Sequence, residues 1–250
     1  PGTSQELGIF WLPSLDRGSE LFDQVKAYTH GDRFPAVPGH KTFTSHYHIE
    51  HATKLIEARE KKGKAVLPPA LRKPEFVEVF KESGMQIVHL AEFHNRLGRS
   101  RRDPDKALPL LKTLHDECAR LSDKGFLLLP GEEPNVHLGG HWISFFPRPV
   151  MWVLNRAKGK PFVEEHPEFG PVYHVGSPED VLKLMELENG LMWAAHPRIK
   201  SSTGYPDLYR EKPFFKSDRY LGGAWKAMPA DLSRPRLGWR VLDLLDDMSN

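Results

Sequence analysis

The sequence predicts an α/β protein, because strand-like segments alternate with helix-like segments along most of its 250 residues. The strand-like runs are 41–48, 87–93, 126–129, 141–146 and 191–195, and the helical patterns are 50–62, 74–81, 103–121 and 177–187. The run at 126–129 is continuously apolar, as in a parallel strand covered on both faces. Such alternation indicates a parallel sheet or barrel, and in both folds functional side chains collect at the carboxyl ends of the strands.

The helix signals at 103–121 are the strongest in the chain. Asp103 can cap the helix, and Pro104 suits its first position. Apolar residues then recur at helical spacing: Leu108, Leu111, Leu114, Cys118 and Leu121. The dipeptide Ser177-Pro178 opens the helix at 177–187 in the same way.

The two ends of the chain carry weaker patterns. Residues 198–236 are rich in Gly, Pro, Ser and aromatic side chains and lack periodicity, which predicts a long ordered loop. Residues 238–248 read as a helix. We expect residues 1–40 to be an N-terminal extension or the end of a preceding domain, and 41–250 to form one domain.

The composition is that of an ordinary soluble globular protein and argues against several classes of function. Lys and Arg total 35 against 33 for Asp and Glu, and the basic residues are scattered, so nucleic-acid binding is not expected. No apolar run reaches membrane-spanning length, so no membrane partner is expected. Cys118 is the only cysteine, which excludes an internal disulfide and a thiolate-rich zinc site.

Histidines beside the strand-like runs are the main functional signal. In His46-Tyr47-His48 both imidazoles project from one face of a strand, and two converging imidazoles form half of a metal site. Further histidines, His94, His141 and His196, also lie beside such runs, which favours ligands over isolated half-exposed side chains. His89 differs, because it lies in mid-strand, where we expect a structural or exposed role.

The segment 130–142 offers the carboxylate that such a site needs. Gly131 lets the backbone turn closely around a ligand, and Glu133 follows it. A carboxylate here can bridge two cations when imidazoles come from adjacent strands. Glu132 and Glu133 would be solvated loop charges if they stood alone, but the neighbouring Gly139-Gly140-His141-Trp142 run favours Glu133 as a bridging ligand.

Motifs of several other enzyme classes are absent from the sequence. It has no His-Glu-x-x-His, no Gly-x-Ser-x-Gly and no Walker-type loop. His48-Ile49-Glu50 matches the first half of a nucleotide-deaminase signature, but the paired cysteines of that signature are missing. Nucleophilic serine and phosphate-loop chemistry therefore have little support.

Four short motifs, in their order and spacing, resemble those of the polymerase and histidinol phosphatase (PHP) superfamily. They are His46-Tyr47-His48, Glu92-Phe93-His94, Gly131-Glu132-Glu133 with His141, and Ala195-His196-Pro197. The resemblance covers residues 41 to 198. Within it, the Glu followed eight residues later by the His of Gly-His-Trp looks most like the carbaryl-hydrolase branch, whose members are metal-dependent hydrolases.

The resemblance implies a fold, a set of ions and their ligands. The fold is a distorted (β/α)7-type barrel, similar to a TIM barrel, with about seven strands. The ions are two or three divalent metals, which for these ligand types would be zinc, manganese or iron. The implied ligands are His46, His48 and Glu133 for one ion, Glu133, His141 and His196 for a second, and His94 with Glu92 or His51 for a third.

Two departures from the family pattern matter. Phe93 stands where the family usually has Asp directly before the His of its second motif, and no Asp-x-His follows Arg198. The second departure leaves open a degenerate, non-catalytic PHP module with a binding or structural role. It also indicates a barrel that is incomplete at its C-terminal end, which the rest of a longer chain or a second copy would complete. The start at Pro1 without Met leaves open a removed signal segment, and with it a location outside the cytoplasm.

The expected activity is hydrolysis of a small-molecule substrate by a metal-activated water, with Arg198 steadying the developing oxyanion. Arg198 and Lys200 are cations close to the proposed ligand His196 in the sequence, whereas Trp142, Trp193 and Phe145 suggest an apolar cavity. An ester, amide or carbamate carbonyl is therefore favoured. A PHP-type phosphoesterase is the alternative, because it would use the same metal core.

Overall fold

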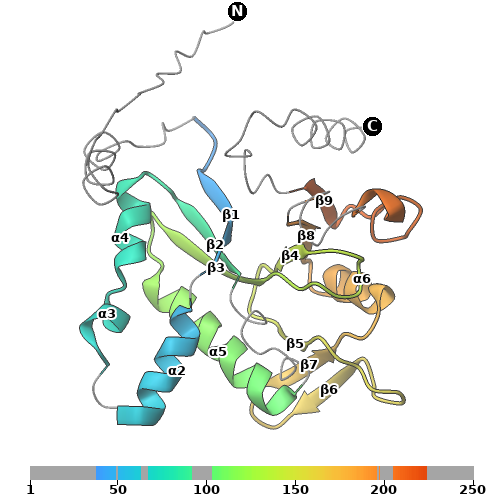
Figure 1. The fold of residues 1–250 in the computed structure, drawn as a ribbon, viewed down its shortest axis with the longest axis horizontal. Coiled ribbons are helices and arrows are strands. Elements are labelled where there is room, and N and C mark those ends of the chain that lie inside the picture. The colour runs from blue at the N-terminus through green and yellow to red at the C-terminus, as the bar shows by residue number, and fades with distance from the viewer. Residues whose placement is uncertain are drawn as a thin grey trace, which may run out of the picture.

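The computed structural model describes residues 38–48, 50–62, 67–91, 103–195, 197 and 205–223, which form a mixed α/β fold (Figure 1). In chain order its elements are β1 (Phe43–Tyr47), α2 (His51–Lys62), α3 (Pro69–Arg72), α4 (Glu75–Glu82), β2 (Ile87–Ala91), α5 (Pro104–Leu121), β3 (Leu127–Glu132), β4 (Trp142–Phe145), β5 (Met151–Val153), β6 (Val163–His166), β7 (Gly170–His174), α6 (Pro178–Leu187), β8 (Leu191–Ala194), the short 3-10 helix η3 (Asp207–Tyr209) and β9 (Tyr220–Gly223). The α/β class predicted from the sequence is confirmed.

Two sheets organise the strands. The larger sheet has the order β1-β2-β3-β4-β8-β9, and the smaller has the order β5-β7-β6. In the larger sheet β1, β2 and β3 are parallel, but β4 runs antiparallel to both β3 and β8. The sheet is therefore mixed, where strand–helix alternation predicted a parallel one. The reason is that a loop without a helix connects β3 to β4, and such a connection suits antiparallel neighbours.

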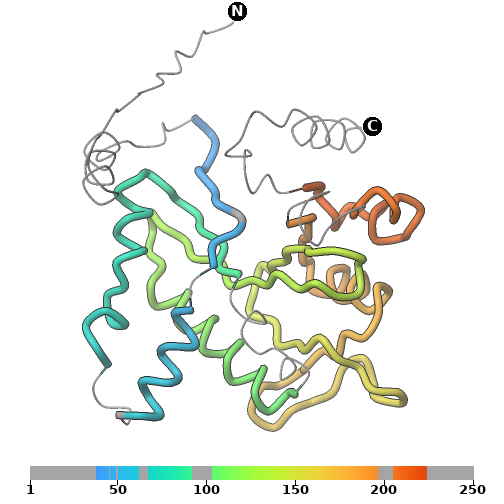
Figure 2. The backbone as a smooth tube through the Cα atoms, in the orientation of Figure 1, coloured from blue at the N-terminus to red at the C-terminus, as the bar shows by residue number. Residues whose placement is uncertain are grey.

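The larger sheet is strongly curled. The ring centroids of Phe43 on β1 and Trp193 on β8 lie 6.2 Å apart. Because β2, β3 and β4 lie between these two strands, a flat sheet would separate them by roughly four strand spacings, or ~19 Å. Within the described residues β1 and β9 remain the two edges, so the sheet forms an open half-barrel, in agreement with the incomplete barrel that we expected (Figure 2).

Helix α5 covers one face of the larger sheet and packs against β3, β5 and α2. It begins as predicted, because the Asp103 carboxylate accepts a hydrogen bond from the Asp105 amide at 3.1 Å and Pro104 is its first residue. Its apolar stripe is buried in the main core with Val88 and Leu90 of β2. The helix predicted at 177–187 is confirmed as α6.

The opposite face of the larger sheet is concave and aromatic. Strand alternation points Val88 and Leu90 toward the helices, and His89, which lies between them, toward this other face. There the His89 ring meets the rings of Phe145 and Trp193, and Trp193 also meets Phe43. We call this face, formed by Phe43, His89, Phe145 and Trp193, the inner face.

The sequence patterns missed several short strands. The smaller sheet is built from strands of three to five residues, which carry too few alternations to show a period. β9 lies within 198–236, so the prediction of a loop there is wrong at 220–223. The helix predicted at 238–248, the N-terminal residues 1–37 and all of 198–204 lie outside the described residues.

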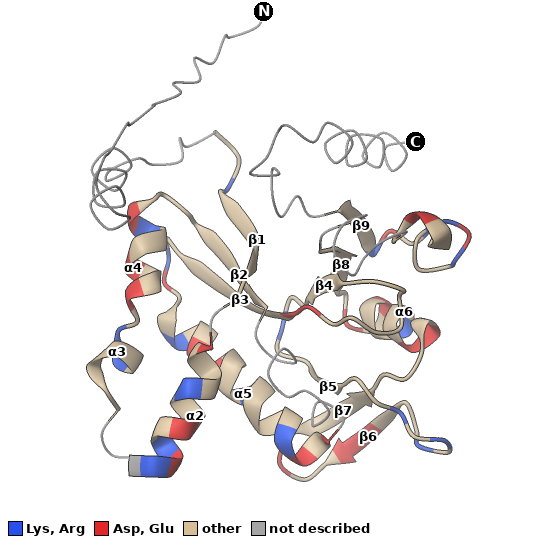
Figure 3. Cartoon of the chain, in the orientation of Figure 1, with Lys and Arg blue, Asp and Glu red and all other residues tan. Residues whose placement is uncertain are grey.

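Charged side chains lie mainly on the outer elements. Figure 3 shows Lys and Arg interspersed with Asp and Glu on α2, α4, α5 and α6, acidic residues on β6, and few charged residues on β1, β2 and β3. None of the described helices is long and apolar enough to cross a membrane.

Candidate metal centre

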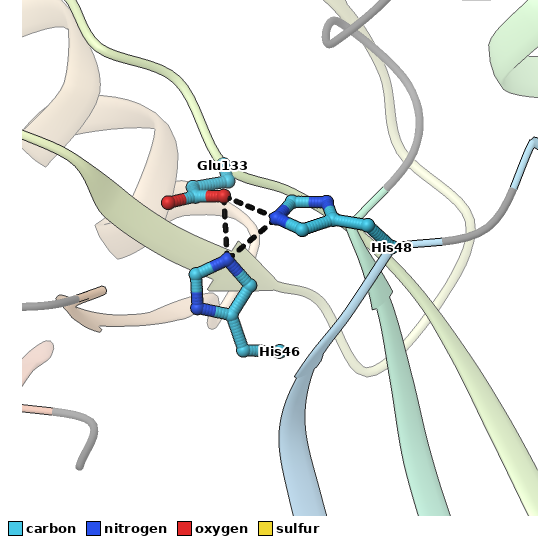
Figure 4. Close-up of side chains that lie close together, drawn as sticks. All are labelled: His46, His48 and Glu133. Atoms are coloured by element: carbon cyan, nitrogen blue, oxygen red, sulfur yellow. Dashed lines mark hydrogen bonds and ion pairs between the residues drawn. The ribbon is translucent and has the colours of Figure 1, made fainter. Parts of the chain in front are cut away.

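Three potential ligand atoms meet at the carboxyl ends of β1 and β3 (Figure 4). His46 Nε2 lies 2.5 Å and His48 Nε2 lies 2.7 Å from the same oxygen of Glu133, Oε2, and the two nitrogens are 2.7 Å apart. The strands are parallel and flank β2, so their carboxyl ends share one edge of the sheet. These three ligand atoms all lie within 4.8 Å of one another, close enough for one metal ion to contact all of them.

Local backbone structure orients His48. Its Nδ1 lies 2.8 Å from the carbonyl oxygen of Ala91, at the end of β2. A carbonyl can only accept a hydrogen bond, so Nδ1 carries the hydrogen, and the neutral ring presents the Nε2 lone pair to the cluster. Histidines that bind metals usually make this kind of contact with their second nitrogen. The register of β1 against β2 shifts between Thr44 and Tyr47, and this irregularity lies where β1 delivers His46.

Glu133 connects the cluster to a third histidine. Its other oxygen, Oε1, lies 3.0 Å from Nδ1 of His141, which directly precedes β4. The Glu133 and His46 side chains are 6% and 5% exposed, whereas those of His48 and His141 are 32% and 23% exposed. The carboxylate thus lies at the bottom of the site, and solvent reaches the site on the side of His48 and His141.

The structure brings together most of the residues that the sequence proposed as metal ligands. His46, His48, Glu133 and His141 form one contiguous group. His94 and His196 lie outside the described residues, as do Glu92, Arg198 and Lys200. His51, the alternative ligand for a third ion, begins α2 and contacts Glu117 Oε2 through Nε2 at 2.8 Å.

The prediction that Trp142 lines an apolar cavity beside the site is wrong. Trp142 is buried in the main core on the helix side of the sheet. Successive residues of β4 point to opposite faces, so Ile143 points to the inner face and Trp142 away from it. Phe145 and Trp193 do lie on the inner face, with ring centroids 5.4 Å apart, and Phe43, which the sequence did not single out, joins them.

We expected Gly131 to let the backbone approach a ligand, but in the structure the group close to Gly131 is the His89 side chain. A Cβ atom at position 131 would lie 1.7 Å from Nε2 of His89. His89 is fully buried, and this burial lowers its pKa to about 4, so the imidazole is neutral at pH 7. We expected a structural or exposed role for His89. The sequence carried no signal that links it to Gly131, because the two meet only through the register of β2 and β3.

The converging atoms suit a divalent transition-metal ion. Two imidazole nitrogens and a carboxylate oxygen match the preferences of zinc, manganese or iron, whereas calcium and magnesium prefer shells of oxygen. The contact between His48 and Ala91 leaves the lone pair of His48 Nε2 directed at the cluster. The residues present therefore fit the kind of ion that the sequence implied.

Comparisons with known proteins give one distant likeness. No family model and no curated protein matches the chain. A solved structure of a two-domain protein from Bacteroides vulgatus ATCC 8482, described as containing a predicted PHP-like metal-dependent phosphoesterase, is 16% identical to this chain, with a TM-score of 0.37. The match covers 72% of this chain and 45% of that protein's chain, so this chain spans less than half of its length. A likeness this distant does not assign the chain to a family.

Proposed function

We propose that the chain is a metal-dependent hydrolase of the PHP type, acting on an ester, amide or carbamate carbonyl of a small molecule. The observation that carries the proposal is the convergence of His46 Nε2, His48 Nε2 and Glu133 Oε2 at the carboxyl ends of parallel strands. Strand ends are where α/β folds gather their chemistry, and this ligand set is suited to metal-assisted hydrolysis.

Each residue of the group has a distinct task in this proposal. His46 and His48 would hold one ion, and Glu133 would join that ion to the His141 side, because its two oxygens already face the two sides. A bound divalent ion would lower the pKa of a water molecule toward neutrality and polarise the substrate oxygen. Ala91 keeps the His48 ring in the tautomer that can bind metal.

The surroundings of the group favour a carbonyl substrate over a phosphate. The inner face of the curled sheet is aromatic: the ring of Trp193 meets those of Phe43 and Phe145. A phosphate pocket needs several convergent cations, whereas aryl or alkyl groups gain from apolar contact. The contact between Glu133 and His141, at the spacing of the carbaryl-hydrolase motif, supports that branch of the superfamily in particular.

Metal content tests the first half of the proposal. We expect purified protein to carry at least one zinc, manganese or iron ion per chain, measured by elemental mass spectrometry. The double substitution His46→Ala/His48→Ala should remove the ion of that site and leave the far-UV circular dichroism unchanged. His40→Ala, which alters an exposed histidine, is the matched control. Equal metal content in the double variant and the wild type would sink the assignment.

Substrate preference tests the second half. At equal metal loading, 4-nitrophenyl esters or carbamates should be hydrolysed faster than 4-nitrophenyl phosphate, and Glu133→Gln should lower both rates. A clear preference for the phosphate would reverse the two hydrolase assignments and favour a PHP-type phosphoesterase. Metal-loaded protein that hydrolyses neither class would favour the degenerate, non-catalytic module.

A further inference from the structure

We propose that His89 is a positioning residue for Glu133: it ties β2 to β4 across Gly131 and so fixes the end of β3 from which Glu133 projects. The inference deepens the proposed function and rests on it for the role of Glu133 as a metal ligand. The geometry of the tie is a property of the metal-free fold.

The His89 side chain spans a neighbouring strand. Its Nε2 lies 2.9 Å from the carbonyl oxygen of Ser144 on β4, although β3 lies between β2 and β4 in the sheet. The carbonyl can only accept, so Nε2–H donates this bond. The ring crosses β3 at Gly131, where a Cβ would lie 1.7 Å from Nε2 and 2.5 Å from the Ser144 oxygen. Only glycine leaves room for this crossing.

The tie lies at the short stretch where β3 pairs with β4. β3 pairs with β2 at five positions but with β4 at only two, Gly131 with Phe145 and Glu132 with Ser144. Glu133 is the next residue, and the residue after it, Pro134, accepts a hydrogen bond from the backbone amide of Trp142 at 3.2 Å. The bond from His89 to Ser144 therefore adds a direct link between β2 and β4 across this short pairing, one residue before Glu133.

Burial makes this link costly to replace. His89 and Ser144 are 0% and 1% exposed, and the rings of Phe145 and Trp193 lie against the imidazole, so water cannot take over the bond. Within the described part of the chain, Nδ1 of His89 is buried without a hydrogen-bond partner. Burying an unpaired polar atom costs free energy, and a leucine at this position would not carry that cost. What the imidazole supplies and an apolar residue lacks is the donor to Ser144.

Two substitutions separate this donor from simple packing. His89→Met keeps an apolar side chain of similar length without a donor, and His89→Gln keeps an N–H near the position of Nε2. We expect His89→Met to weaken zinc binding by on the order of tenfold, as for other residues that orient metal ligands. His89→Gln should stay within about threefold of the wild type. Zinc affinity is measured by competition with a chromophoric chelator.

A matched control and a second variant guard against a general loss of stability. His174→Met alters another buried histidine, in the smaller sheet, where Nε2 faces Glu164 at 3.3 Å. It should lower stability without changing zinc affinity. If His89→Met does not fold, His89→Asn takes its place, because its shorter amide cannot reach Ser144.

Hydrogen exchange in the metal-free protein provides a readout that does not depend on metal. Peptides covering 130–146 should exchange faster in His89→Met than in wild type or His89→Gln, while α5 peptides keep their protection. Equal exchange in all three proteins, or unchanged zinc affinity in folded His89→Met, would overturn the inference. If the wild type binds no metal, the proposed function fails, and the exchange data alone still decide whether His89 holds the end of β3.

Discussion

Two carboxylates, Glu133 and Glu117, are buried beside histidines but face different surroundings. Glu133 meets its histidines at strand ends, where the partly exposed His48 opens the group to solvent. Glu117 meets His51 at 2.8 Å and Arg120 at 2.5 Å between α2 and α5, with the cation on the neighbouring turn of its own helix. Arg120 balances the charge of Glu117, so Glu117 has a structural role in the core. Glu133 instead directs its oxygens at several imidazoles.

The pKa of Glu117 reflects these neighbours. Burial by itself would raise the pKa of this carboxyl, but the hydrogen bonds from His51 and Arg120 outweigh it and lower the pKa to about 2. Since the pKa is lower in the folded state than in the unfolded chain, the ionised carboxylate stabilises the fold at neutral pH. This contribution is lost as the pH falls from the unfolded pKa, near 4.5, through about 2.

The first prediction concerns this pH window. Glu117→Gln should lower the free energy of unfolding at pH 7 by about 3 kcal/mol, because it leaves a buried charge network without its anion. The difference between wild type and variant should shrink as the pH falls from about 5 toward 2, since the wild-type carboxyl also becomes neutral there. Urea unfolding at a series of pH values measures both effects. Glu57→Gln, on the exposed side of α2, is the control; a pH-independent difference for Glu117→Gln would contradict the argument.

At the scale of elements, helix α5 packs its apolar residues into the main core, against the sheet whose strand ends carry the site. Its buried residues face the main core, and its exposed side carries ion pairs such as Lys112 with Asp116 at 2.8 Å. The helix lies on the opposite face of the sheet from His89 and Trp193. Stability and metal binding should therefore respond to different substitutions.

The second prediction tests that separation. Leu114 is 1% exposed, so Leu114→Ala should lower the free energy of unfolding by about 3 kcal/mol through lost burial and a cavity. Lys112→Ala, two residues away on the exposed side of the helix, should cost less than about 0.5 kcal/mol. Zinc affinity of the folded protein should be the same in both variants. A drop in affinity for Leu114→Ala, measured by chelator competition, would mean that the core and the site are coupled.

At the scale of the whole molecule, the candidate ligands belong to segments far apart in the sequence. His46 lies in β1 and His48 directly follows it, whereas Glu133 and His141 are the two ends of the connection from β3 to β4. Unfolding separates these segments, so an ion that binds all of them binds only the folded chain. Metal binding should therefore stabilise the fold.

The third prediction gives that stabilisation a size. At a free zinc concentration one hundred times the dissociation constant, the free energy of unfolding should rise by about 2.7 kcal/mol. A chelator should reverse the rise, and His46→Ala/His48→Ala should remove it. Thermal unfolding with and without zinc makes the measurement. An equal shift in the double variant would show that zinc binds elsewhere.

Local patterns in the sequence determined the elements that have local causes. The cap at Asp103 and the helix from Pro104 follow from side chains within a few residues, so their spacing alone predicts them. The same holds for His46 and His48, whose separation on a strand puts their rings together, and for Glu133, which stands out by its flanking glycines and His141.

Tertiary structure decided everything that depends on which strands are neighbours. The antiparallel course of β4 sends Trp142 into the core, and strand register brings His89 over Gly131 and the Ala91 carbonyl to His48. The curl of the sheet brings Phe43 to Trp193. None of these contacts leaves a mark in residue spacing, because partners on different strands are joined only through register and curvature. Sequence periodicity records which face of an element is apolar, not what that face will meet.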